Sequence, residues 1–238
     1  IYHHPALLID PTKLIRLGRC STVMVDGHYF GVDKYVHFVH MGQIYFRTYR
    51  GALAGGATEA EAVQKALDLA GGGHPSPPEN TGLGMFSTGI RSNADLAANY
   101  CGLKFFRNLT EPVMLRGELR PPLLIREGPY CRMNDNVRPN SDFFTWFVSD
   151  HWDEALVPNV YIARVVQKCV EDEVRKRCAD IAEWYRDHRG MRRTREDFRR
   201  LTDQLRTYYG EDYRIHGTLD DMLNIANACF ADRATTTP

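Results

Sequence analysis

The sequence has no long apolar run and no excess of charge of either sign. No hydrophobic stretch approaches the roughly 20 residues that a membrane-spanning helix needs, so we expect no transmembrane segment. Thirty Lys and Arg side chains balance thirty Asp and Glu side chains. No global field therefore draws the chain toward nucleic acid or anionic lipid, and we do not expect nucleic acid among its partners.

The six cysteines form no CxxC pair and show no zinc-finger spacing. Two interpretations stay open: mostly buried free thiols, or one or two disulfides in an oxidising compartment. Cys169 and Cys178 lie nine residues apart on one predicted helix. They would point to opposite sides, about 13 Å apart along the axis, and could not bond to each other.

The chain is long enough to bury a substantial core, with 238 residues of which 43% are hydrophobic and 25% charged. Helical periodicity predicts a mainly α fold, a multi-helix globular domain with a small β-hairpin and an irregular Pro-rich middle segment. We expect a single domain over residues 1–238. A subdivision would give a helical core (1–110), an irregular segment (111–158) and a helical hairpin with a terminal helix (159–238).

The first half contains one β-like segment and one strong helix. Residues 22–30 include the turn signal Asp26-Gly27, which predicts a small hairpin or an extended loop. Residues 32–53 are predicted to be helical, because apolar and aromatic residues recur there at helical spacing. That apolar face contains Tyr35, Phe38/Val39, Gly42, Tyr45/Phe46 and Tyr49.

The same predicted helix carries a second, polar stripe. Asp33, His37, His40 and Arg47 fall at i, i+4, i+7 and i+14. An acid and two imidazoles in this arrangement could bind a divalent metal, or Asp33 could orient His37 as a general base. A polar helix face, with an Asp–His pair that holds a neighbouring loop, explains the same residues.

A second helix with a polar face is predicted from Ser92 to about residue 109. Ser92-x-x-Asp95 is a helix-start pattern. Asp95 could be a simple helix cap or a functional group, and the sequence leaves both interpretations open. The polar face contains Ser92, Asp95, Asn99 and Gly102, and the opposite, buried face contains Leu96, Tyr100, Leu103 and Phe106.

Capping patterns predict the remaining helices. Asn159 would begin a long helix to about residue 188, with Val166 and Ile181 on its buried side. Alternating charges in 160–209 indicate a solvated helical hairpin rather than a nucleic-acid surface. The helix-start patterns begin at Thr58, Asn159, Thr194 and Thr218.

The segment 111–158 contains six prolines and few helical repeats, which predicts irregular structure with short strands. Near its end an aromatic run leads into an acidic cluster. Sugars stack on aromatic rings and hydrogen-bond to carboxylates, so this cluster would suit a glycan-binding groove. An aromatic core segment followed by a helix cap explains the same residues. The candidate substrate-binding residues here are Trp146, Asp150, His151 and Trp152.

The stretch 74–102 is where we expect the catalytic acid, Glu79. Three prolines precede Glu79 closely and a Gly-rich run comes after it. Prolines restrict the backbone and so pre-position the residues next to them, and glycines allow a ligand to approach the backbone closely. Loops beside rigid helices often carry functional groups. A surface acid without function is the alternative interpretation.

The two polar helix faces also carry a resemblance. Asp33-Lys34-x-x-His37-Phe38, paired with Ser92-x-Ala94-Asp95-Leu96-x-Ala98-Asn99-x-x-Gly102, resembles a pattern in small uncharacterised bacterial envelope proteins. It covers residues 32–110, under a third of the chain. The resemblance implies a bacterial, exported protein, periplasmic or secreted, in which both polar stripes face one site.

The leading functional hypothesis is a hydrolase that acts on a glycan, such as a bacterial envelope polysaccharide. It would use carboxylate general acid/base catalysis without a cofactor, as glycosidases do, with one carboxyl group protonated and one ionised. Its candidate catalytic residues are Glu79, Asp95, Asp33 and His37, and Asn99 joins the aromatic cluster among the candidate substrate-binding residues.

Two other functions compete with this hypothesis. A metal-dependent hydrolase of the phosphoester type would bind zinc or another divalent metal. A non-catalytic envelope or carbohydrate-binding protein would need no reactive group. The candidate metal ligands are Asp33, His37, His40, Asp95 and His151.

Overall fold

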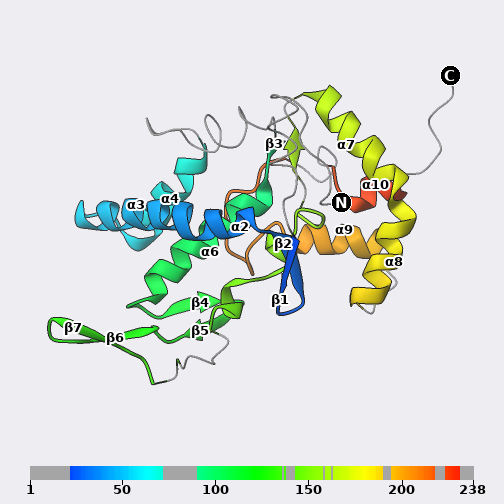
Figure 1. Cartoon of the computed structure of the whole chain (residues 1–238). Helices are drawn as coiled ribbons and strands as arrows, with labels where there is room; N and C mark the ends of the chain where they lie inside the picture. The colour runs from blue at the N-terminus through cyan, green and yellow to red at the C-terminus, as the bar shows by residue number, and fades with distance from the viewer. Residues whose placement is uncertain are drawn as a thin grey trace, which may run out of the picture.

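The chain folds into helices with several short antiparallel strand pairs, as the computed structural model shows (Figure 1). The prediction of a mainly α fold is therefore confirmed. The structure describes residues 22–71, 90–135, 137, 143–157, 159–161, 163–189, 194–217 and 223–230.

The first described element is the predicted hairpin, in which β1 (Thr22–Val25) pairs with β2 (His28–Gly31). Its turn residues, Asp26 and Gly27, have φ angles of 52° and 77°. Asp and Gly tolerate this left-handed conformation better than most residues, which is why the pair is a reliable turn signal.

A continuous helical segment comes after the hairpin. It consists of α2 (Asp33–Val36), the π-helical turn η1 (His37–Met41) and α3 (Gly42–Ala54). The prediction of a helix over residues 32–53 is confirmed, but the π turn was not predicted. In this turn the Gly42 N–H reaches back five residues to the carbonyl oxygen of His37. Such turns are rare and are often found at functional sites.

Two further helices pack against this segment. The predicted capping box begins α4 (Glu59–Gly71), where the Glu61 carboxylate accepts from the Thr58 N–H at 2.8 Å. The central helix is α6 (Asn93–Asn108), which begins where the Ser92 hydroxyl accepts from the Asp95 N–H. Both predicted helix starts are confirmed. Most of α6 is buried, because α3 covers one side of it and short turns cover another.

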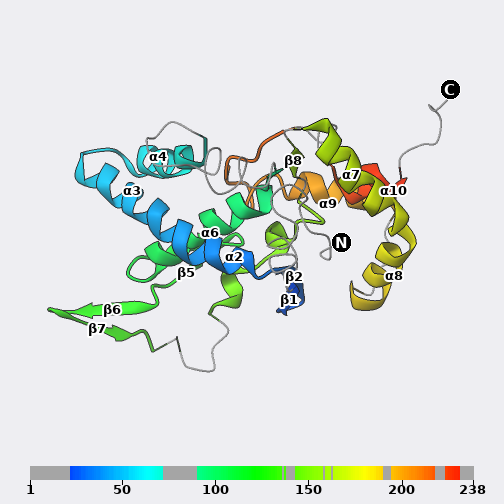
Figure 2. The same cartoon turned by 45° about the horizontal axis from the view of Figure 1, so that its top comes forward.

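The middle segment forms two hairpins and two short 3₁₀ turns, in agreement with the predicted short strands. In Figures 1 and 2 the second hairpin extends away from the helices. The elements are β4 (Val113–Leu115), β5 (Glu118–Arg120), β6 (Leu124–Glu127), β7 (Tyr130–Met133), η2 (Thr145–Phe147) and η3 (Asp150–Trp152).

The C-terminal part differs from the predicted long helix over 159–188. Residues Val160–Tyr161 form a strand, β8, that pairs with β3 (Ile90–Arg91), and the helical stretch breaks at Arg177. Cys169 and Cys178 therefore lie on different helices. The predicted helix start at Thr218 lies outside the described residues. The helices are α7 (Arg164–Lys176), α8 (Cys178–Arg189), α9 (Arg195–Gln204) and α10 (Ile225–Phe230).

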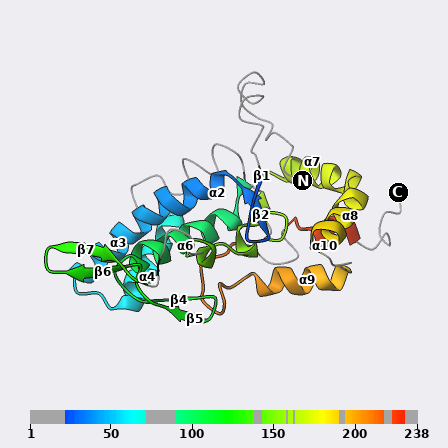
Figure 3. The ribbon, with the colours of Figure 1, turned by 60° about the horizontal axis from the view of Figure 1, so that its bottom comes forward.

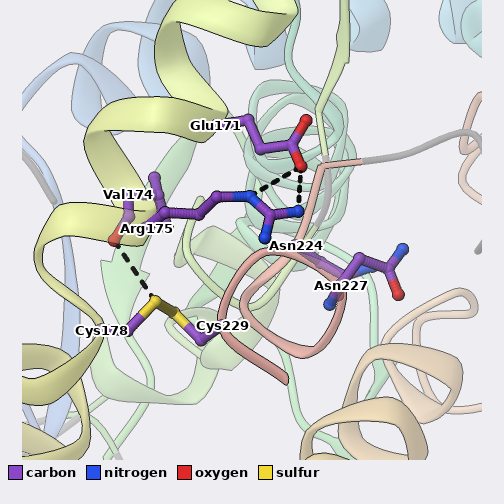
Figure 4. Close-up of a disulfide and its surroundings, with 7 residues drawn as sticks. All are labelled: Glu171, Val174, Arg175, Cys178, Asn224, Asn227 and Cys229. Carbon is purple, nitrogen blue, oxygen red and sulfur yellow. Dashed lines mark hydrogen bonds and ion pairs between the residues drawn. A yellow bond between two sulfur atoms is a disulfide. The ribbon is translucent and has the colours of Figure 1, made fainter. Parts of the chain in front are cut away.

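A disulfide fastens the last helix to this group (Figure 4). Cys178 at the start of α8 is bonded to Cys229 of α10. The Cys178 sulfur also lies 3.5 Å from the Val174 carbonyl oxygen of α7. Of the other cysteines that the structure describes, Cys101 is buried, whereas Cys131 and Cys169 are exposed free thiols. The interpretation with one disulfide is thus the one that the structure supports.

Two hydrophobic clusters make up the core, and they interlock. The larger one lies around α3, α4 and α6, but it includes Tyr208 and Tyr213 from the segment after α9. The smaller one lies among α8, α9 and α10 and includes Ala94 of α6. Tyr29 of β2 also packs edge-on against Trp184 of α8, at 4.7 Å between ring centroids. Packing thus crosses the subdivision into 1–110, 111–158 and 159–238.

Seen from below in Figure 3, the N-terminal hairpin lies between the α3–α6 layer and the α7–α10 group. Among the described residues, no helix is both long enough and apolar enough to cross a membrane.

Candidate functional site

A buried ammonium group lies at the centre of the site. Lys34 of α2 is 0% exposed. Its Nζ lies 2.7 Å from Asp33 Oδ2, 2.5 Å from Asp95 Oδ1 and 2.7 Å from Glu154 Oε1. A lysine ammonium has three donors, so all three are used. We call Asp33, Lys34, Asp95 and Glu154 the Lys34 cluster.

The three carboxylates keep Lys34 charged. Burial alone would lower its pKa, but Asp95, Glu154 and Asp33 together outweigh burial and hold the pKa of Lys34 well above its ordinary value. Lys34 is therefore an ammonium ion at neutral pH. It orients the acids and cannot act as a nucleophile, which requires the neutral amine.

The carboxylates differ in their access to solvent. The side chain of Asp33 is 45% exposed, that of Glu154 30% and that of Asp95 13%. Glu154 Oε1 also accepts from the Ser92 hydroxyl at 2.9 Å, so two donors fix this oxygen. Within the described structure, Glu154 Oε2 makes no hydrogen bond and stays available to a ligand.

His37 and Asn99 extend the cluster along the interface between η1 and α6. His37 Nε2 lies 3.3 Å from Asp95 Oδ2, and His37 Nδ1 lies 3.1 Å from Asn99 Oδ1. The prediction that Asp33 and His37 face the same site as Asp95 and Asn99 is confirmed by these distances and by the shared contact with Lys34. His40 and Arg47 of the same predicted stripe are exposed. Asn99 is fully buried, and its Nδ2 has no hydrogen-bond partner within the described residues.

The close approach of two glycines explains this proximity. A Cβ on Gly42 would lie 2.5 Å from the Cα of Gly102, so the backbones of α3 and α6 touch at this crossing. His37 precedes Gly42 by about one turn, and Asn99 precedes Gly102 by about one turn. Their side chains therefore meet next to the crossing, and Asp95 lies one further turn along α6.

The carboxylates could also be considered as metal ligands. One oxygen from each of Asp33, Asp95 and Glu154 lies within 4.8 Å of the other two, and oxygen donors suit Mg²⁺, Ca²⁺ or Mn²⁺. However, the Lys34 ammonium already bonds to all three acids, so a metal ion would compete with it. His40 lies on an exposed part of the π turn.

The charge of Glu154 also acts on Tyr161, whose hydroxyl shares a hydrogen bond with the Asn159 side chain. Burial, together with the negative charge of Glu154, raises the pKa of Tyr161 to about 12. The Tyr161 hydroxyl is therefore protonated at neutral pH and can donate a hydrogen bond. β8 holds Tyr161 opposite Ile90, two residues before the Ser92 cap.

The expected glycan-stacking residues lie mostly in the core, which corrects the interpretation of residues 142–154 as a groove. Trp152 is 0% exposed and packs edge-on against Phe30, at 5.0 Å between ring centroids. His151 is 3% exposed, with Nε2 2.9 Å from the Thr207 carbonyl oxygen. Burial lowers the pKa of His151 to about 4, so it is neutral and faces the protein interior. It is not a ligand of the Lys34 cluster.

The remaining candidate residues, Asp150, Trp146 and Glu79, have no contact with the Lys34 cluster among the contacts that the structure describes. Asp150 Oδ1 lies 2.7 Å from His28 Nδ1. Trp146 is partly buried, and the guanidinium of Arg120 covers its ring at 4.7 Å. Glu79, the predicted proton donor, lies outside the described residues, so its role stays a prediction.

Sequence reasoning missed Lys34, Glu154 and the role of the Ser92 hydroxyl. A signal for Lys34 was present: it precedes Phe38 and Met41 at i, i+4 and i+7, and both of these are buried. A lysine in line with a buried stripe is rarely fully buried unless it is paired. Glu154 gave no such signal, because it is 120 residues away in the sequence.

No family model matches the chain, and no curated protein and no solved structure matches it.

Proposed function

We propose that the protein is a hydrolase that acts on a glycan, and that the Lys34 cluster is its acid–base centre. One observation carries the proposal: Asp33 and Glu154 are partly exposed, and each is fixed through one oxygen to the same buried ammonium. Retaining glycosidases hold two carboxyl groups about 5–5.5 Å apart, whereas inverting enzymes need about 6.5–9.5 Å. One oxygen of Asp33 and one oxygen of Glu154 lie within 4.8 Å of each other, which is nearer to the separation in retaining enzymes.

The proposal gives each group a role. Glu154 is the nucleophile or base, because Lys34 and Ser92 fix Oε1 while Oε2 can reach a substrate. Asp33, the more exposed acid, is the proton-transfer partner, and Glu79 is the alternative proton donor. Asp95 is a positioning residue, because its two oxygens contact Lys34 and His37. This revises the catalytic role that the sequence suggested for Asp95.

The disulfide supports the proposed location. Disulfides persist mainly in oxidising compartments, and Cys178–Cys229 is one. This is consistent with a periplasmic or secreted protein whose substrate is an envelope polysaccharide.

The test is an assay of sugar release from purified bacterial cell wall and from soluble glycans. Glu154→Gln and Asp33→Asn should keep the fold and lower turnover by about 10²–10⁴-fold, the usual contribution of general acid/base catalysis. Glu196→Gln, which changes an exposed acid of α9, is the matched control and should turn over like wild type. Glu79→Gln assayed in parallel decides which acid supplies the proton. Full turnover in Glu154→Gln would overturn the assignment.

A metal-dependent hydrolase is the second candidate, favoured by the proximity of the three carboxylates. It predicts a stoichiometric divalent metal in protein purified without an affinity tag, and loss of activity with a chelator. In that case Asp33, Asp95 and Glu154 would be the ligands, and His37 would orient Asp95. Glycan binding without turnover or metal would instead indicate the non-catalytic carbohydrate-binding protein.

A further inference from the structure

Two carboxylates of the Lys34 cluster are attached to residues of the smaller hydrophobic cluster. Ala94, the residue before Asp95, is fully buried, and Ala155, the residue after Glu154, is also buried. Both alanines belong to the smaller cluster, together with side chains of α8, α9 and α10. Because each acid is next in the chain to a buried member of this cluster, the packing of the C-terminal core sets the positions of both carboxylates.

The last helix, α10, completes that core and is held by a covalent bond. It has six residues, and a helix so short is not stable in isolation. Its side chains Ile225 and Ala226 are buried in the smaller cluster. A bond outside the backbone, the disulfide between Cys178 and Cys229, ties α10 to α8, as Figure 4 shows. The disulfide therefore keeps two core side chains in place.

A second connection runs from α10 to Glu154 through the backbone. Leu223, two residues before α10, forms an antiparallel bridge with Asn159. Asn159 directly precedes β8, which pairs with β3, and β3 ends at the residue before Ser92. The Ser92 hydroxyl donates to Glu154 at 2.9 Å. Displacement of α10 would thus disturb the bridge, the strand pair next to it and the hydroxyl that fixes Glu154.

Solvent can reach the disulfide. Cys178 and Cys229 are each only partly buried, and thiol–disulfide exchange depends on such access. The thiolate of a dithiol attacks one sulfur, and the second thiol of the reagent then releases the protein as the reagent closes to its own disulfide. Two electrons and two protons pass to the protein, which gains two thiols. The bond can therefore be cut while the rest of the fold is intact.

We propose that the Cys178–Cys229 disulfide is a redox switch that controls the geometry of the Lys34 cluster. With the bond intact, α10 completes the smaller cluster, and Asp95 and Glu154 bond to Lys34. When a dithiol reduces the bond, α10 is released, both acids shift and Lys34 becomes accessible. The larger cluster around α3, α4 and α6 keeps its packing. The effect on turnover rests on the proposed hydrolase function, whereas the effect on Lys34 does not.

Acetylation of lysines in the full chain, measured by mass spectrometry at neutral pH, tests the proposal. Lys34 should be protected in the oxidised protein, and reduction with dithiothreitol should raise its labelling at least about tenfold through local opening. Lys104 is the matched control: it is 5% exposed and bonds to Glu211, but it lies on α6 beside the larger cluster. Lys104 should stay protected in both states. Lys65, which is exposed, should be labelled throughout.

Two cysteine variants assign the effect to this disulfide. Cys178→Ser should label Lys34 like the reduced wild type without any reductant, and adding reductant should change nothing further. Cys169→Ser removes an exposed free thiol of α7 and should behave like wild type in both states. A Lys34 that stays protected in Cys178→Ser would overturn the proposal.

Sugar release from the same samples separates the switch from the proposed activity. It should fall on reduction and return on reoxidation. Labelling of Lys34 and Lys104 together after reduction would overturn the proposal, because the disulfide would then stabilise the whole fold rather than the site. Selective labelling of Lys34, without sugar release in either state, would uphold the control of the cluster and contradict the hydrolase function.

Discussion

Gly42 and Gly102 touch where α3 crosses α6, and no larger residue fits at either position. A Cβ on Gly102 would lie 2.7 Å from the Gly42 Cα and closer still to the backbone oxygen of Phe38. These contacts are with backbone, so no side chain can move aside. The crossing fixes the distance between the helix that carries Lys34 and His37 and the helix that carries Asp95 and Asn99.

The crossing should therefore be sensitive to a single methyl group. We expect Gly102→Ala to lower the free energy of unfolding by about 1–3 kcal/mol or more, as overpacking does. Gly51→Ala is the control, because Gly51 lies inside α3 with nothing within 4 Å of its added Cβ. It should raise the free energy of unfolding by up to about 1 kcal/mol through helix propensity. Urea denaturation measures both, and equal effects would contradict the role of the crossing.

Lys34→Met should destabilise the fold by about 3 kcal/mol, because it leaves Asp95, whose side chain is 13% exposed, without the buried cation that it contacts. The folded state raises the pKa of Lys34. The contribution of the Lys34 charge to the free energy of unfolding is therefore fully present below the unfolded pKa of about 10.4. It is lost as pH rises through the folded pKa.

The difference in free energy of unfolding between wild type and Lys34→Met should thus be constant from neutral pH to about pH 10 and shrink above it. Denaturant titrations along a pH series measure this difference. Lys65→Met, on an exposed position of α4, should differ little from wild type. A Lys34→Met variant as stable as wild type would show that the ammonium is dispensable.

His151 should make the protein sensitive to mild acid. Its folded pKa of about 4 lies below the unfolded value of about 6.5, so the folded state favours the neutral ring. This stabilisation is present above about pH 6.5 and is lost as pH falls toward 4, on the order of 3 kcal/mol in total.

His151→Gln removes the titrating ring, so its free energy of unfolding should fall less steeply than that of wild type over this pH interval. His40→Gln, at an exposed position, should keep the wild-type slope. Thermal or urea unfolding between these pH values measures the slopes, and parallel curves for His151→Gln and wild type would contradict the burial argument.

Ile181 and Val166 were both predicted from the sequence to be buried, but only Ile181 is buried in the structure. Ile181 of α8 is 6% exposed, whereas α7 has no buried residue and Val166 is only partly buried. We expect Ile181→Ala to cost about 2–5 kcal/mol through lost burial and a cavity, and Val166→Ala clearly less. Replacement of Arg186, an exposed residue of α8, should change the melting temperature little. Equal losses at Ile181 and Val166 would show that α7 is buried more deeply than the structure indicates.

Local patterns could be predicted from the sequence because their causes are local. The Asp26-Gly27 turn and the Thr58, Ser92 and Thr194 helix starts depend on residues at most three positions apart. Asp33 and His37 also face the same site as Asp95 and Asn99, as expected, since helical periodicity places side chains on a face.

Long-range packing could not be predicted in this way. Glu154 reaches Lys34 across 120 residues, and Cys178 reaches Cys229 across 51. The aromatic and acidic residues next to Trp152 in the sequence fit an exposed sugar-binding tryptophan as well as a core residue. Trp152 is buried by contacts with Phe30 and Phe38, which are distant in the sequence. The break at Arg177, where α7 ends and α8 begins, carries no Gly or Pro that would have marked it.

The π turn His37–Met41 has a consequence for how the site tolerates changes of chain length. It holds one more residue than an α-helical turn, which offsets α2 from α3 by about 100° around the axis. Lys34 lies in the same buried row as Phe38 and Met41 of the turn and as Tyr45 and Tyr49 of α3. We expect a one-residue deletion within the turn to leave α3 packed but to rotate Lys34 away from Asp95. The length of this turn, independently of which residues it contains, sets the position of the buried ammonium.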